Sequence, residues 1–210
     1  MYTKGELTKQ NIVKAVNQLF NEKEMLPSWD DLASELKINR SRITNYFPKK
    51  ELLILAIYLE FEENLKMLIE KQGYTEQIEN FSALKEYYSD IMDLLFDYRF
   101  AISYVLVNPN NDEDLNNHIS TTYKNNKLRL YQRVEHLVNA GLVSKKLLDE
   151  NQFKPFAFQH TNILTTWIIS YRLYDRHLEF SEIKPIYLKG VLLCYFPFLS
   201  EKGKKEIGSL

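Results

Sequence analysis

The chain has 210 residues with 27 Lys and Arg against 28 Asp and Glu, and this balance excludes a uniformly cationic protein that coats nucleic acid. It is long enough to bury one large or two small cores, and its low content of six Gly and six Pro favours long helices over many turns. A single cysteine, a polar first ten residues and the lack of a long uninterrupted apolar run predict a cytoplasmic protein without disulfide, signal peptide or membrane span.

The charge is uneven along the sequence. Residues 1–50 contain nine Lys and Arg and six Asp and Glu, a net +3, which leaves eighteen against twenty-two, a net −4, for the rest. The positive excess therefore lies at the N-terminal end. Within it, Thr8 is predicted to cap a first helix that places Ile12, Val16 and Phe20 on one face, and Pro27 separates this helix from the next.

Residues 28–50 are predicted to form two short helices joined by a turn. Ser28 precedes an apolar stripe that begins at Trp29, and Asn39 precedes a second, mostly polar helix over residues 40–47. This arrangement indicates a helix-turn-helix, whose second helix enters the DNA major groove. Residues 36–50 include five cations and no acid, as phosphate neutralisation requires. The alternative is a solvated three-helix corner that happens to be basic.

The same residues resemble the N-terminal domain of the TetR family of bacterial transcriptional regulators. The resemblance covers roughly the first quarter of the chain and depends most on Leu32-Ala33 and on the run from Tyr46 to Leu53. It implies an all-α fold with a three-helix DNA-binding domain over residues 1–50 and a larger ligand-binding and dimerisation domain over residues 51–210. The residues expected at the DNA are Thr8, Arg40, Ser41, Arg42, Thr44, Asn45, Tyr46 and Lys50.

The chain departs from the family pattern at several positions. Glu24 and Lys37 stand where the family usually has glycine, Thr44 where many members have tyrosine, and Lys49 where a small capping residue is usual. The geometry of the turn and the base contacts therefore cannot be copied from relatives.

Helices are predicted over residues 49–72, 75–98, 100–107, 112–140, 151–176 and 182–196, followed by a polar tail. Gly73 and Gly141 are expected helix ends, Thr75 an expected cap, and residues 108–111 an expected turn. The fourth helix is apolar on two sides, so we expect it to connect the two domains.

The last two long helices are predicted to form a four-helix dimer interface, because a helix that is apolar nearly all round must be covered on two sides. The alternative is a central helix buried in a monomer. The expected interface residues are Phe156, His160, Ile183, Tyr187, Gly190, Val191, Cys194 and Tyr195.

A cavity for an aromatic or lipophilic effector is predicted in the C-terminal domain, where most of the aromatic residues lie. Taken one at a time, each of these residues is more often plain core than a ligand contact. The candidate lining residues are Phe61, Tyr88, Met92, Phe96, Tyr104, Tyr123, Trp167 and Tyr171.

The sequence indicates no enzyme, since the four histidines lack metal-binding spacing and there is no nucleophile elbow or phosphate loop. We expect no metal and no cofactor. The leading hypothesis is a homodimeric, ligand-responsive repressor that binds a palindromic operator. The alternatives are a helical small-molecule-binding or assembly protein whose helix-turn-helix no longer engages DNA, and an enzyme with a site built from distant residues.

Overall fold

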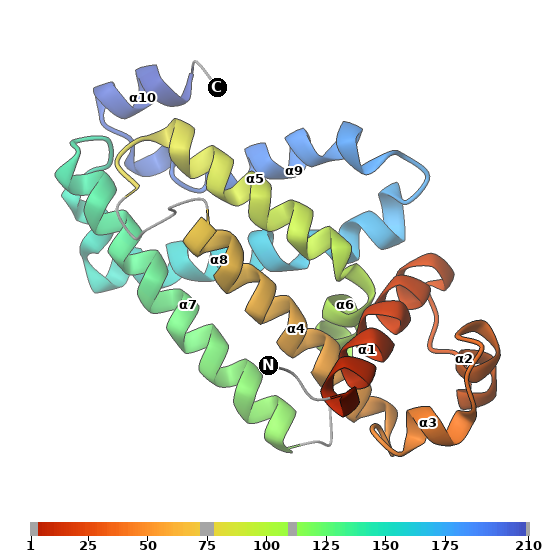
Figure 1. The fold of residues 1–210 in the computed structure, drawn as a ribbon. Helices are drawn as coiled ribbons and strands as arrows, with labels where there is room; N and C mark the ends of the chain where they lie inside the picture. The colour runs from red at the N-terminus through yellow and green to blue at the C-terminus, as the bar shows by residue number, and fades with distance from the viewer. Residues whose placement is uncertain (1–3, 72–77, 109–112, 209–210) are drawn as a thin grey trace. The chain divides into compact units, whose positions relative to one another are not determined.

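The computed structural model describes residues 4–71, 78–108 and 113–208, and within these ranges the chain is helical with no strand (Figure 1). The all-α fold class predicted from the sequence is confirmed. The extended backbone in these ranges includes one isolated antiparallel bridge, between Val143 and Leu199. In the described part of the chain, no helix is both long and apolar enough to cross a membrane.

The residues group into two compact units. Unit 1 comprises Met1–Leu65 and Leu94–Leu115, and unit 2 comprises Lys66–Asp93 and Asn116–Leu210. The sequence-based division at residue 50 stays a prediction.

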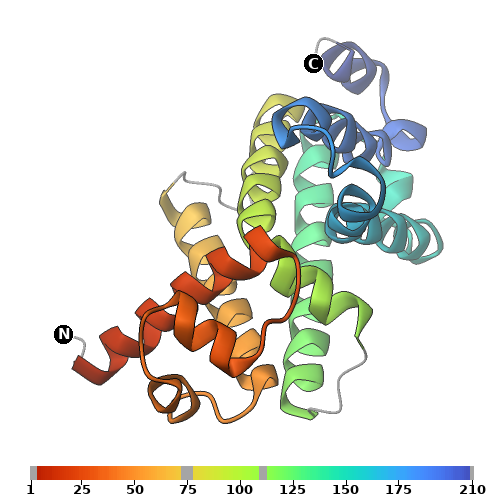
Figure 2. The same cartoon turned by 90° about the vertical axis from the view of Figure 1, so that its right-hand side faces the viewer.

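Unit 1 contains α1 (Lys4–Lys23), α2 (Trp29–Glu35), α3 (Arg40–Thr44), most of α4 (Lys50–Lys71), the end of α5 (Phe81–Asp97) and α6 (Arg99–Val107). Figure 2 shows α1 running past the α2–α3 pair. The apolar stripes predicted from the sequence meet in the core of this unit, where Val16, Leu32 and Ile43 are fully buried. Phe20 of α1 contacts Phe100 of α6, with ring centroids 5.2 Å apart.

Two buried asparagines connect α1 to the junction of α5 and α6. The side-chain amides of Asn17 and Asn21 both donate to the carbonyl of Asp97, at 2.9 and 2.6 Å. The Asn21 side-chain oxygen accepts from the backbone amide of Phe100 at 3.0 Å. These bonds satisfy backbone groups at a helix end and a helix start, so they fix how α1 packs in unit 1.

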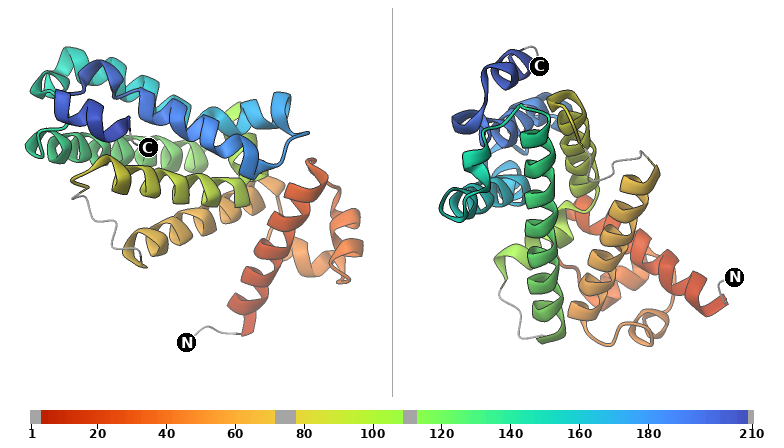
Figure 3. Two further views of the ribbon diagram at one scale, coloured as in Figure 1. Left: turned by 90° about the horizontal axis from the view of Figure 1, so that it is seen from above. Right: turned by 90° about the vertical axis from the view of Figure 1, so that its left-hand side faces the viewer.

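Unit 2 contains most of α5 and α7 (Glu113–Asn139), then η1 (Lys145–Leu148), α8 (Glu150–Ser170), η2 (Tyr171–Asp175), α9 (Phe180–Leu193), η3 (Phe196–Phe198) and α10 (Glu201–Ile207). Figure 3 shows α9 lying along α8, and the two helices are in contact. Leu84, Val134, Leu137, Ile168 and Val191 are fully buried and form part of the core.

The start of two helices differs from the prediction. Helix α1 begins at Lys4, so Thr8 lies inside the helix and is not its cap. Helix α5 begins at Phe81, because the Asn80 side chain accepts from the amide of Ala83 at 2.7 Å. The predicted signals Gly73, Thr75 and Pro109 lie outside the described residues.

The predicted end of α7 is confirmed. Gly141 has φ = 73°, and the amides of Gly141 and Leu142 donate to the carbonyls of Val138 and Leu137, both at 2.9 Å. This is a Schellman motif, which pairs the last carbonyls of the helix.

Candidate nucleic-acid interface

Helix α2 begins at a capping box. The amide of Asp31 donates to the Ser28 hydroxyl and the amide of Ser28 donates to the Asp31 carboxylate, both at 3.1 Å. Hydrogen bonds from the Ser28 side chain, and then from its backbone, hold the pKa of the Asp31 carboxyl below its ordinary value. The sequence-based prediction of Ser28 as the cap is confirmed. The cap fixes where α2 starts and therefore where the following turn falls.

The turn between α2 and α3 is a Schellman motif with lysine in place of glycine. Lys37 has φ = 53°, its amide donates to Ser34 at 3.2 Å, and the amide of Ile38 donates to Ala33 at 3.0 Å. Glu24, which ends α1, has φ = 51°. The two departures from family glycines noted in the sequence are thus positions where the backbone is left-handed, and that conformation is strained for a residue with a side chain.

Helix α3 separates apolar from polar residues completely. Ile43 is fully buried, and Phe47, just beyond the helix, is 1% exposed. The remaining side chains are exposed or half-buried: Arg40, Ser41, Arg42 and Asn45 are exposed, and Thr44 and Tyr46 are half-buried. The predicted helix over residues 40–47 ends at Thr44, with Asn45 as its C-cap. Asn39 occupies the N-cap position in an extended conformation, but its side chain makes no capping hydrogen bond.

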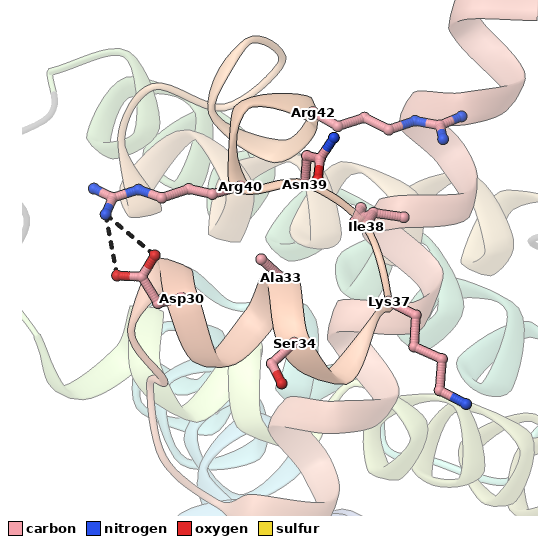
Figure 4. A pocket seen from close by; sticks show the side chains of 8 residues that line it. All are labelled: Asp30, Ala33, Ser34, Lys37, Ile38, Asn39, Arg40 and Arg42. Carbon is pink, nitrogen blue, oxygen red and sulfur yellow. Dashed lines mark hydrogen bonds and ion pairs between the residues drawn. The ribbon is translucent and has the colours of Figure 1, made fainter.

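A shallow open groove of about 550 Å³ lies between α2 and α3 (Figure 4). Its lining residues are Asp30, Ala33, Ser34, Lys37, Ile38, Asn39, Arg40 and Arg42. Arg40 and Arg42 extend to opposite sides in this view, and Arg40 forms an exposed ion pair with Asp30 at 3.1 Å. Asp30 thus places an acid beside the cationic segment, which contains none of its own.

Two further cations lie near α3. Lys50, the first residue of α4, places its ammonium 5.9 Å from the ring centroid of Trp29. Lys9 of α1 lies over Phe47 at 5.5 Å. Thr8 is half-buried on the same helix. The surface around α3 can therefore offer guanidinium and ammonium donors to phosphates and short polar side chains to base edges.

Comparison with known proteins gives a structural likeness only. No family model and no curated protein matches the sequence. A crystal structure of a TetR-family transcriptional regulator from Marinobacter aquaeolei VT8 matches with a TM-score of 0.81 and 18% identity, over 100% of this chain and 97% of that chain. The chain has the TetR fold.

The predicted effector residues lie in both units of this TetR fold. Phe61, Phe96 and Tyr104 belong to unit 1, where Phe61 contacts Tyr98 with ring centroids 5.7 Å apart. Tyr88, Met92, Tyr123, Trp167 and Tyr171 belong to unit 2. In unit 2, Tyr88 and Met92 are fully buried, Trp167 stacks on Phe180 at 5.4 Å, and Tyr123 is exposed. The assignment of these residues to an effector cavity stays a prediction.

Most of the residues that the sequence predicts at a dimer interface are buried within the single chain. Phe156, His160, Ile183, Val191, Cys194 and Tyr195 are all buried within unit 2. Tyr187 is half-buried and donates a hydrogen bond to Asp175. The same two helices expose other apolar side chains, namely Phe158 on α8 and Ile186 and Leu193 on α9. Gly190, another predicted residue, is half-buried and lies on the same side of α9 as Ile186 and Leu193. The assignment of the predicted residues to a dimer interface stays a prediction.

Proposed function

We propose that the chain is a DNA-binding transcriptional regulator of the TetR family. The observation that supports this most directly is α3, which buries Ile43 and leaves Arg40, Ser41, Arg42 and Asn45 exposed next to Lys37. A short helix with a wholly polar, cationic outer side suits the major groove. The regulator fold found by structural comparison supports the same function.

The exposed residues divide by the chemistry they offer. Arg42, Ser41, Thr44 and Asn45 are proposed to contact base edges, because arginine and asparagine pair with guanine and adenine through two hydrogen bonds. The proposed phosphate contacts are Thr8, Tyr46 and Lys50. Lys50 begins α4, so its ammonium and the first amides of that helix can bind one phosphate together.

Arg40 has a different position because Asp30 already neutralises it. Both side chains are more than half exposed, so the ion pair is weak and can be exchanged for a phosphate or a base. We propose that Arg40 contacts DNA only after leaving Asp30. Asp30→Asn should then tighten binding to all sequences, because it removes both the competing carboxylate and a negative charge near the phosphates.

We further propose that the protein acts as a homodimer on a palindromic operator. Ile186 and Leu193 are seven residues apart on α9, so they lie on one side of that helix, with Gly190 between them. Pairing of this side with its copy would give an isologous interface and would place two α3 helices about 34 Å apart, one turn of DNA.

The regulator is proposed to be a repressor that a small hydrophobic or aromatic effector releases. An effector in the C-terminal domain would have to bind one conformation of the dimer more tightly than the conformation that fits the operator. The fourth helix, α4, runs from unit 1 into unit 2 and is the segment expected to respond.

Fluorescence anisotropy with the DNA upstream of the protein's own gene tests the proposal. Lys50→Ala should weaken binding to every sequence. It should also reduce the slope of log affinity against log salt concentration by about one phosphate contact per recognition helix. Arg42→Ala should instead relax the preference for particular bases. Lys205→Ala, an exposed lysine on α10, is the matched control. A protein that forms no salt-sensitive specific complex would contradict the proposal and favour a small-molecule-binding protein.

A further inference from the structure

Arg133 of α7 is a buried charge without an acidic partner. It is 8% exposed, and among the described residues no carboxylate forms an ion pair with it. One guanidinium nitrogen, Nη1, donates to the Tyr87 hydroxyl at 3.1 Å, and the group lies 4.8 Å from the centroid of the Tyr87 ring. Its Nε is buried and has no hydrogen-bond partner.

The polar groups around Arg133 do not supply a negative charge. The hydroxyls of Tyr88 and Tyr195 are hydrogen-bonded to each other at 3.0 Å. Burial raises the pKa of Tyr88 to about 12 and holds the pKa of Tyr195 well above its ordinary value, so both stay neutral. His160 is 2% exposed, and its Nε2 also has no partner. Burial, and then the charge of Arg133, lowers the pKa of His160 to about 3, so this ring is neutral as well.

Burying a guanidinium without an acidic partner lowers the stability of the fold, so a purely structural role explains Arg133 poorly. Buried charges are normally paired, and an apolar side chain of similar volume is usually more stable than an uncompensated ion. The hydrogen bonds to the hydroxyls of Tyr87 and Tyr88 and the ring contact to Tyr87 recover only part of the lost hydration. An anion at Arg133 would remove this imbalance.

We propose that Arg133 is the anion-binding residue of the effector site, and that the effector is an organic carboxylate with an aromatic or apolar body. The proposal rests on the proposed function. Within unit 2, α5, α7, α8 and the residue Tyr195, which follows α9, all contribute to the surroundings of this guanidinium. The free Nε offers a charge-assisted hydrogen bond to a carboxylate oxygen, and His160 Nε2 is a second unpartnered polar atom nearby.

The side chains packed around this group are mostly aromatic. Phe156 contacts Tyr195 with ring centroids 5.0 Å apart, and Tyr88 contacts His160 at 5.1 Å. A ligand that binds next to Arg133 would therefore have to place a flat or apolar body among aromatic rings. One guanidinium in an apolar setting favours a singly charged carboxylate over a doubly charged, strongly hydrated phosphate.

Isothermal titration calorimetry without DNA tests this proposal. The probes are benzoate, 2-naphthoate and octanoate, each against its neutral amide, which has nearly the same shape. At least one carboxylate should bind the parent protein at least about tenfold more tightly than its amide, because only the ion forms the charge-assisted bond. If no carboxylate exceeds its amide, the proposal is wrong.

Two variants separate an anion site from a structural arginine. Arg133→Met removes the charge at similar volume, so it should abolish the preference for carboxylate while the ligand-free protein melts no lower than the parent. Arg129→Met, one turn away on α7 and exposed, should keep the preference. A carboxylate preference that survives in Arg133→Met would overturn the assignment.

The test is independent of the DNA experiment. A protein that binds DNA but shows no carboxylate preference keeps the proposed function and loses this inference. A carboxylate preference without DNA binding keeps the Arg133 site and loses the regulator.

Discussion

Single residues in strained or desolvated positions account for several features of this chain. Glu24 and Lys37 have left-handed backbones, with φ of 51° and 53°, where glycine would be free of strain. His160 and Arg133 are polar groups in the core of unit 2. Each of these residues lowers the free energy of unfolding for a local reason. Urea unfolding can measure the effect at Lys37 and at His160.

Lys37→Gly should stabilise the protein by up to about 1 kcal/mol, because glycine adopts the left-handed conformation without strain. The gain is limited because glycine also raises the conformational entropy of the unfolded chain. The measurement is the midpoint of urea unfolding. Lys37→Ala removes the same charge but keeps the strain, so it should give no such gain. Equal stability of the two variants would show that charge, and not backbone conformation, controls this position.

Stability should fall in acid because of His160. The unfolded histidine takes up a proton below its ordinary pKa of 6.5, whereas the folded one does so only near 3. The stability contribution is therefore complete above pH 6.5 and is lost toward pH 3, by up to about 1.4 kcal/mol per pH unit.

His160→Phe should flatten this dependence, since phenylalanine keeps the ring contacts with Tyr88, Phe156 and Tyr195 but cannot be protonated. Urea unfolding from pH 7 to pH 4 measures the slope for parent and variant. His177→Phe, at an exposed histidine, is the control. Parallel slopes for the parent and His160→Phe would mean that another group causes the loss.

At the scale of elements, local signals predicted most of the helices. The capping box at Ser28, the apolar stripe of α2 and the Schellman motif at Gly141 each depend on neighbours a few residues away, and the structure confirms them. The start of α1 was missed because Thr8 resembles a cap, although the helix continues back to Lys4. Helix α10 was missed as a full element because its stability comes from tertiary contacts.

Those contacts hold α10 against the end of α7. The Ser200 hydroxyl donates to the carbonyl of Gly141 at 2.7 Å, and Lys202 donates to that of Ala140 at 2.9 Å. From the same helix, Glu206 accepts from the amide of Phe81 at 2.7 Å and so completes the start of α5. Gly203 is buried, and a Cβ there would lie 2.1 Å from the carbonyl oxygen of Leu142.

Gly203→Ala should therefore displace α10 and destabilise the protein by about 1–3 kcal/mol, the usual cost of overpacking a core. Thermal unfolding measures the loss, and limited proteolysis should show faster cleavage after residue 200. Lys205→Ala changes an exposed residue of the same helix and should behave like the parent. Unchanged protease resistance in Gly203→Ala would contradict the close contact.

At the scale of the whole molecule, the question is which surface a second chain would cover. Six of the eight residues that the sequence assigned to an interface are buried in unit 2, and α9 also exposes Ile186 at 64% and Leu193 at 48%. Exposed apolar residues that recur on one side of a helix indicate a contact surface.

Replacing Ile186 and Leu193 together by Asp should convert a dimer into monomers and abolish specific operator binding, because two facing carboxylate pairs cannot be buried. Light scattering after gel filtration distinguishes the mass of two chains from that of one. Leu128→Asp, at a residue of α7 exposed at 59%, should leave the mass unchanged. If the double variant stays dimeric, the interface lies elsewhere.

The sequence by itself determined the all-α class, the helix-turn-helix and its polar second helix, because these depend on side-chain spacing and caps within a few residues. Only the tertiary structure decided which side of α8 and α9 is buried, that Asp30 pairs with Arg40, and that Arg133 lies among tyrosines without an acid. A helix that is apolar nearly all round has no preferred inside in its own pattern. Residues distant in the chain decide which side of such a helix faces the core. They also decide whether a buried charge finds a partner of opposite charge.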